Sequence, residues 1–212
     1  MQSYDQSRRR FAVALAAMAG FVDAVGFLSA NGYFVSFMSG NTTRLGVDIA
    51  TAPAKAIVPA LLIIGFLGGV TGGALLSLRA GRHRKPAVLS LVAALLLAGA
   101  SARALGLPLV MLACLVAAMG AINNTFQRNG EVAIGITYMT GALVKLGQGI
   151  ANRMVGAAGT GWSSWLQLWA GLLTGAVIGA FTQDRLPLGC LWIAAAWALA
   201  MIAVAWRLPS EP

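Results

Sequence analysis

Long apolar runs separated by short polar gaps make up most of the chain. Six of the runs are long enough to cross a bilayer, for which an α-helix needs about 20 residues. Two further segments, 39–52 and 140–153, are shorter and more polar. At 1.5 Å per residue each short helix spans only about 20 Å, less than the hydrocarbon thickness of roughly 30 Å. The six predicted spans are 11–31, 56–79, 87–105, 107–126, 162–182 and 187–206.

Composition supports a membrane location. Of the 212 residues 58% are hydrophobic and only 10% are charged, whereas a soluble domain carries about 25% charged residues. This excludes a soluble enzyme or a secreted binding module, and the pattern predicts an all-α integral membrane protein with the lipid bilayer as its partner. The net charge of +9 does not indicate nucleic-acid binding, because most basic residues lie in short gaps between the apolar runs.

The basic residues also predict how many times the chain crosses the membrane. If both short segments are re-entrant, six crossings and an inside N-terminus place ten basic residues in the cytoplasm and three outside, with Arg44 and Lys145 inside the short helices. If both short segments cross, seven basic residues lie in the cytoplasm and six lie outside. Only the first arrangement follows the positive-inside rule. We therefore expect cytoplasmic N- and C-termini.

The two halves of the chain repeat each other at an offset of 101 positions. The tetrads 37–40 (Phe-Met-Ser-Gly) and 138–141 (Tyr-Met-Thr-Gly) match, as do 44–46 and 145–147, and after a two-residue slip Gly68 and Gly72 match Gly171 and Gly175. This predicts two membrane repeats, 1–106 and 107–212, each with three spans and one short re-entrant helix. Three is odd, so the second repeat has the opposite orientation. Inverted repeats of this kind are common in transporters, whose substrate sites lie at the midplane.

In this arrangement both short helices have their N-termini near the bilayer centre, with Ser39 and Thr140 as expected N-caps. Two helix N-termini present unpaired N–H groups and positive dipole ends, which favour an anion or an electron-rich polar group. We expect a Cβ at either neighbouring glycine to intrude on this site. The residues predicted to line the path of a substrate or ion are Asp23, Ser39, Gly40, Asn41, Thr42, Asn123, Asn124, Thr140 and Gly141. Arg44 and Lys145 either add positive field there or have a structural role, paired to a carboxylate or reaching a membrane surface.

Asp23 is an acid in the middle of the first predicted span, where a carboxylate is costly unless it is paired or hydrated. The functional hypothesis is that it carries protons or gates transport. The structural alternative is a salt bridge with Arg44 that positions the short helix. At an offset of 101 its equivalent is Asn124, an amide that cannot titrate and that can also simply bridge helices.

The pattern of residues favours transport over catalysis. No metal-binding, nucleotide-binding or nucleophile motif is present, and the spans hold no His, so we expect neither enzyme activity nor a cofactor. The function predicted is a transporter or channel for a small anionic or polar solute. A membrane scaffold or assembly protein is the first alternative, and an intramembrane enzyme is the second. Six helices make a small bundle, which leaves a homodimer open.

Three segments resemble the YoaK-like, DUF1275 family of bacterial membrane proteins. They are 20–27 (Gly-Phe-Val-Asp-Ala-Val-Gly-Phe), 37–42 (Phe-Met-Ser-Gly-Asn-Thr) and 137–141 (Thr-Tyr-Met-Thr-Gly). Where such proteins typically show a Gln-Asn pair in the second half, this chain has Asn123-Asn124, which keeps an amide but shortens it. The resemblance implies a six-span protein of the bacterial inner membrane and does not imply a substrate.

Overall fold

Six long helices and two short ones form the fold. The computed structural model describes residues 5–128, 131–156 and 162–208. In that part of the chain the short helices are α2 (Met38–Thr51) and α6 (Met139–Met154). All eight helices begin and end within a few residues of the predicted limits. The long helices are α1 (Gln6–Ser29), α3 (Ile57–Ala80), α4 (Arg84–Ala104), α5 (Pro108–Ile122), α7 (Trp162–Arg185) and α8 (Cys190–Arg207).

Short connections link these helices. The 3₁₀ turns η1 (Pro53–Lys55) and η2 (Gly81–His83) precede α3 and α4. Helix α5 ends earlier than predicted, because the chain tightens into the 3₁₀ turn η3 (Asn123–Thr125). A small antiparallel hairpin of β1 (Gln127–Arg128) and β2 (Glu131–Val132) follows, which the all-α prediction did not include.

Local sequence explains several helix boundaries. The Asp5 carboxylate accepts a hydrogen bond from the Arg8 N–H at 2.7 Å and caps α1. Pro108 occupies the first turn of α5, where its missing N–H costs nothing. Gly81 has a φ of +52°, a left-handed conformation that favours glycine and that breaks the chain between α3 and α4.

The long helices have the length and composition of membrane spans; α5 by itself has 15 residues, one fewer than α6, and reaches 18 together with η3. Five segments of the described chain are long and apolar enough to cross a membrane. One of them, Pro53–Ala104, has 52 residues and contains both α3 and α4. A single helix of that length would measure about 78 Å, more than twice a bilayer's hydrocarbon core. The chain is therefore an all-α, multi-pass integral membrane protein, apart from its small hairpin.

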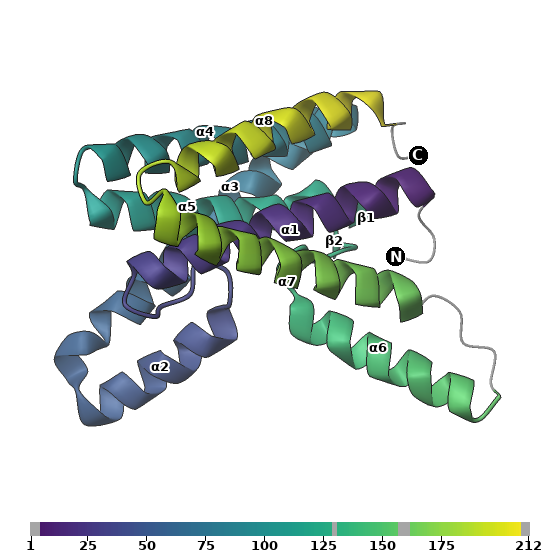
Figure 1. Ribbon diagram of the computed structural model, residues 1–212, viewed down its shortest axis with the longest axis horizontal. Helices are drawn as coiled ribbons and strands as arrows, with labels where there is room; N and C mark the ends of the chain where they lie inside the picture. Colours follow the sequence, from purple (N-terminus) through teal and green to yellow (C-terminus); the bar gives the residue numbers. More distant parts are fainter. Residues whose placement is uncertain (1–4, 129–130, 157–161, 209–212) are drawn as a thin grey trace.

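Side-chain contacts identify the two ends of the bundle. At one end, Arg9 of α1 contacts Ser164 of α7, and His83 stacks on Trp206 of α8. At the other end, Arg103 of α4 contacts Ser29 of α1 and Cys190 of α8. Figure 1 shows α2 directed toward this second end and α6 toward the first.

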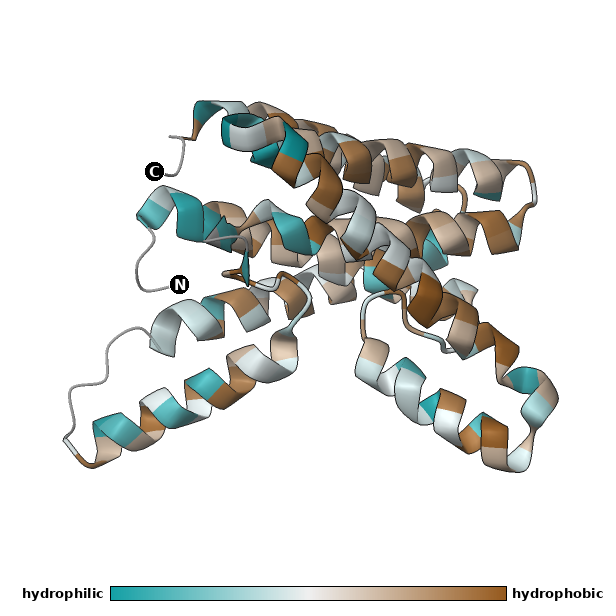
Figure 2. Ribbon diagram, turned by 180° about the vertical axis from the view of Figure 1, so that it is seen from behind, coloured by the Kyte–Doolittle hydropathy of each residue, from teal (hydrophilic) through white to brown (hydrophobic). Residues whose placement is uncertain are grey.

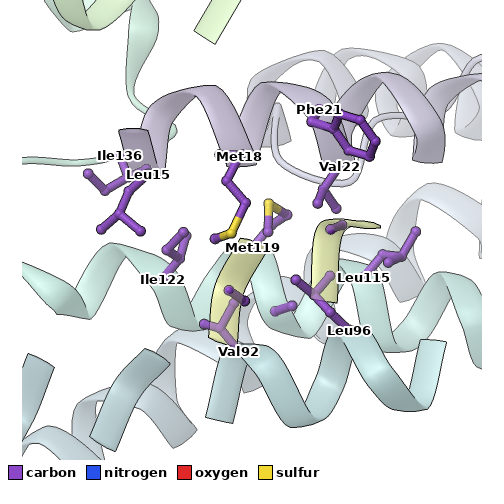
Figure 3. Packing of buried hydrophobic residues seen from close by; sticks show 14 of the residues in the cluster. Leu15, Met18, Phe21, Val22, Val92, Leu96, Leu115, Met119, Ile122 and Ile136 are labelled. Atoms are coloured by element: carbon purple, nitrogen blue, oxygen red, sulfur yellow. The ribbon is translucent and has the colours of Figure 1, made fainter. Parts of the chain in front are cut away.

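The core lies where α1, α5, α4 and α8 meet. Leu15, Met18 and Val22 of α1 point toward Met119 and its neighbours on α5 (Figure 3). All of these side chains are fully buried or nearly so. The core has the apolar character of a soluble protein's interior, but in lipid its stability depends on close packing rather than on removal of apolar surface from water.

Glycines allow two parallel helix pairs to approach closely. A Cβ on Gly175 of α7 would collide with the backbone of Ala17 of α1, and one on Gly69 of α3 would collide with the backbone of Ala117 of α5. Gly179 faces Phe21 in the same way as Gly73 faces Ala121. Such contacts of small residues with backbone are typical of membrane helix pairs.

These contacts correct the predicted register between the halves. Ala17 and Ala117 differ by 100 positions, and Gly69 and Gly175 differ by 106. Gly68 and Gly72, which the sequence comparison matched to Gly171 and Gly175, have no atom within 4 Å of the point that a Cβ would occupy, and they do not make the equivalent contact. Similar residue types led to a match that packing does not support.

The close approach at Gly175 can be tested by adding one methyl group. We expect Gly175→Ala to lower the free energy of unfolding by about 1–3 kcal/mol, because the new methyl overlaps the Ala17 backbone. Gly72→Ala is the matched control on α3, where a Cβ meets open space. It should leave stability unchanged or raise it by up to about 1 kcal/mol through helix propensity. Unfolding of the purified proteins in detergent measures both, and equal stabilities would contradict the packing described.

Candidate functional site

Asp23 holds the non-helical segment that leads into α2. Its Oδ1 atom accepts hydrogen bonds from the N–H groups of Val35 and Ser36, at 3.0 and 2.9 Å. Asp23 lies six residues before the end of α1, or about 9 Å along the axis. Irregular backbone at membrane depth needs partners inside the protein. The carboxylate supplies them for two consecutive N–H groups.

Asn41 holds the same segment from the α2 side. Its side chain is fully buried, accepts from the Phe34 N–H at 3.2 Å and donates to the Phe34 carbonyl at 2.7 Å. This two-way pairing imitates a strand contact and satisfies both backbone groups of one residue. The predicted path residues Asp23 and Asn41 thus act on one loop, from opposite sides.

A corresponding arrangement precedes α6. The Asn123 Oδ1 accepts from the Thr137 N–H at 3.2 Å, and its amide donates to the Thr137 hydroxyl at 3.1 Å. Thr137 corresponds to Ser36 at the offset of 101, so by contact the equivalent of Asp23 is Asn123. The prediction that Asn124 is its equivalent was wrong, because the α1–α5 register is 100 rather than 101.

Asn124 belongs to a different polar cluster. It donates to the Val70 carbonyl of α3 at 3.0 Å and accepts from the Gln127 amide at 2.9 Å. The side-chain oxygen of Gln127 in turn accepts from the Ser77 hydroxyl at 2.9 Å, and its backbone carbonyl accepts from the Arg84 guanidinium. Asn124, Gln127 and Ser77 are buried and hydrogen-bonded to each other. The cluster joins α3 to the segment after α5.

Neither short helix has the predicted N-cap. Helix α2 begins at Met38 with Phe37 in the cap position, and α6 begins at Met139 with Tyr138 there; no side chain caps either helix. Ser39 and Thr140 therefore lie inside the first turn. This leaves donors unpaired: the N–H groups of Ser39, Gly40, Thr140 and Gly141 have no acceptor among the described residues.

The two glycines at these helix starts differ. A Cβ on Gly40 would lie 2.5 Å from Cδ1 of Phe37, so the space there is filled by an aromatic ring. A Cβ on Gly141 would have no neighbour within 4 Å. The expected close approach of the two helix starts to each other at these glycines is therefore not observed, and an approach to a ligand stays a prediction. The space beside Gly40 is filled by the Phe37 side chain of its own segment, and the space beside Gly141 is open.

Arg44 and Lys145 each lie against an aromatic ring. The Arg44 guanidinium lies 4.7 Å from the centroid of Tyr33, and the Lys145 ammonium lies 4.2 Å from that of Trp165. Within the described chain Arg44 makes no ion pair with Asp23, which excludes the salt bridge considered as an alternative role for the acid. Cation–π contacts still leave the positive charge on each side chain.

The polar side chains at the two helix starts are unequal. Thr42 is exposed, but its hydroxyl donates to the Met38 carbonyl at 2.8 Å, so toward a solute it can only accept. The equivalent position in α6 is Leu143. The α2 start is therefore the more polar of the two.

The short helices diverge from the middle of the molecule. Figure 1 shows both starting below the bundle, with their N-terminal ends as their nearest ends, and α2 packing mainly on α3 while α6 packs mainly on α7. Along both, polar and apolar residues alternate, unlike in the long helices (Figure 2). Helix α2 buries only Asn41, and α6 buries only Ala142. No hydrogen bond joins the two starts within the described chain.

Sequence reasoning missed several residues of this site. The N–H groups of Phe34, Ser36 and Thr137 donate hydrogen bonds to predicted site residues, yet these three residues were not themselves predicted as part of the site. One signal was available: Ser36 and Thr137 are both hydroxyl residues, at the offset of 101, next to the matching tetrads. Ser77 had no comparable signal, because its partner Gln127 lies 50 positions away.

Comparison with known proteins agrees with these features. Residues 11–204 match the family model described as "Protein of unknown function (DUF1275)". Over 209 residues the chain is 36% identical to UPF0700 transmembrane protein RA0705 of Rhizobium meliloti (strain 1021), covering 95% of this chain and 90% of that protein. No solved structure matches the chain. The match over nearly all the described helices and the identity to a transmembrane relative show that this chain belongs to the DUF1275 family of membrane proteins.

Proposed function

We propose that the protein is a transporter or channel for a small anionic or polar solute, which binds between the starts of α2 and α6. One observation carries this proposal: two helices begin beside the same bundle with first-turn N–H groups that have no acceptor among the described residues. Each start has a positive dipole end of about half a charge. Donors and dipoles of this kind attract anions and electron-rich oxygen atoms.

The charges near the helix starts agree with this choice of solute. Arg44 and Lys145 lie six residues after the first residue of α2 and α6, and cation–π contact leaves their charge in place. One oxygen of the Asp23 carboxylate accepts from two N–H groups of its own loop, which partly offset its negative charge. The helix starts therefore combine donors with net positive field, which disfavours a small cation.

The proposal also assigns the two halves to inverted repeats. The α1–α7 and α5–α3 pairs use equivalent glycine contacts. The two helices within each pair are parallel, and one pair runs in the opposite direction to the other. Asp23 and Asn123 hold equivalent loops, and α2 and α6 begin at equivalent methionines. Two inverted halves would bring one re-entrant helix from each side of the membrane, an arrangement that recurs in many secondary transporters.

Flux through reconstituted protein tests the proposed site. Proteoliposomes are assayed with chloride, nitrate and formate as small anions and with urea and glycerol as neutral solutes. We expect Gly141→Val to abolish flux of the transported solute, because the side chain enters the open space at the α6 start. Stability should be unchanged, since no atom lies within 4 Å of the added Cβ.

Gly147→Val is the matched control, six residues further along the same helix and equally open. It should transport like the unmodified protein. Flux equal to that of empty liposomes for the whole panel would overturn the transport function. Flux that survives Gly141→Val would leave transport in place but remove it from this site.

The proposal includes a location in the bacterial inner membrane with both termini in the cytoplasm. His83 lies at the bundle end where α8 finishes, and Leu105, which is 74% exposed, follows α4 at the opposite end. The basic cluster at 82–85 favours the cytoplasm for the first of these ends.

Cysteine labelling in intact cells tests this orientation. Single cysteines are introduced as His83→Cys and Leu105→Cys in a chain whose Cys114 and Cys190 are replaced by alanine. An impermeant maleimide should label the Leu105→Cys chain from outside and the His83→Cys chain only after permeabilisation. The reverse pattern would place the termini outside the cell.

A further inference from the structure

A cavity of about 250 Å³ lies between α1, α7 and the loop before α2. Its floor consists of small residues, its walls include two phenylalanines, and Asp23 is the charged residue in its lining. Leu28 lines it too and is 53% exposed, so the cavity reaches the surface of the bundle. The lining residues are Gly20, Asp23, Ala24, Phe27, Leu28, Phe34, Leu172, Ala176 and Ala180.

The charge of Asp23 is not needed for its contacts with the backbone. In the second half Asn123, a neutral amide of similar shape, accepts the equivalent hydrogen bond from Thr137. An amide at position 23 would therefore hold the loop as well. The negative charge is an addition, and Asp23 makes no ion pair with any basic side chain of the described chain. A partly buried carboxylate without a cation is costly, so a cationic partner from outside the chain would stabilise the charged form of Asp23 beyond what its two N–H partners provide.

The lining decides which cation fits. Hard metal ions need six or more oxygen ligands, and here a single carboxylate faces apolar and aromatic groups. Phe27 and Phe34 lie with their ring centroids 4.9 Å apart, and aromatic rings attract organic ammonium groups. A cavity of about 150 Å³ already holds a benzene molecule, so this one has room for a ring with a short ammonium arm.

We infer that this cavity binds a small organic ammonium ion, with its cationic group on Asp23 and its apolar part between Phe27, Phe34 and the alanines of α7. Such a ligand enters from the membrane side, past Leu28. The site is separate from the anion-favouring helix starts and goes beyond the proposed function, since it does not depend on whether transport occurs.

Calorimetric titration of the detergent-purified protein tests this inference, with benzylammonium as the probe. Benzyl alcohol and benzoate have the same ring but are neutral and anionic. Benzylammonium should bind at least about tenfold more tightly than either, which corresponds to about 1.4 kcal/mol. Asp23→Asn should remove this preference for the cation, while its thermal stability stays near that of the unmodified protein because the amide still holds the loop.

Two further variants make the result specific. Ala180→Leu fills the cavity and should weaken benzylammonium binding at least about tenfold without changing any charge. Asp48→Asn removes an acid of α2 that does not line the cavity and should bind like the unmodified protein. If Asp23→Asn is unstable, Ala180→Leu alone decides. Undetectable binding of benzylammonium at millimolar concentration, or equal binding in the unmodified protein and Ala180→Leu, overturns the inference.

Discussion

Backbone N–H groups outside regular helices need acceptors from elsewhere in the protein, and the loops that lead into α2 and α6 obtain them from side chains. The segments before them are not helical, and the N–H groups of Phe34, Val35, Ser36 and Thr137 have no backbone acceptor among the described residues. Asp23 and Asn41 supply partners before α2, and Asn123 supplies one before α6. Because these three side chains fix the loops, they also fix the position and direction of the short helices. The donors left over are those of the first helical turns, to which the proposed function assigns the solute.

Close packing supports this arrangement. Each loop is held by hydrogen bonds to a side chain near the end of α1 or α5. A shift of that helix would therefore break the hydrogen bonds that hold the loop. Gly175 and Gly69 let α1 and α5 contact their parallel partners through backbone atoms. Parallel partners come from different halves of the chain, since α1 pairs with α7 and α3 with α5. The halves therefore depend on each other and do not form two separate domains in space.

Hydropathy was sufficient to predict the helices, but the site needed three-dimensional contacts. Span limits follow from the length of apolar runs, and Gly81 and Pro108 mark boundaries by local geometry. The caps were wrongly predicted because Ser39 and Thr140 are favourable cap residues locally, whereas the loops are held from 12 or more positions away by Asp23 and Asn123. No local rule contains a contact of that length. The repeat offset failed within the long helices for a related reason: connections of different length shift the register, and only packing reveals the shift.

The two halves share their packing but differ in chemistry. Glycine contacts, helix starts and loop attachments recur, because each is required by backbone geometry that both halves have in common. The side chains free of that requirement differ. The carboxylate of Asp23 in one half corresponds to the amide of Asn123 in the other, and Thr42 corresponds to Leu143. Backbone N–H groups at the helix starts remain equivalent, since they do not depend on side chains. The solute of the proposed function would therefore meet similar donors from both helix starts but acceptors mainly from the α2 side, which would orient any solute whose two ends differ.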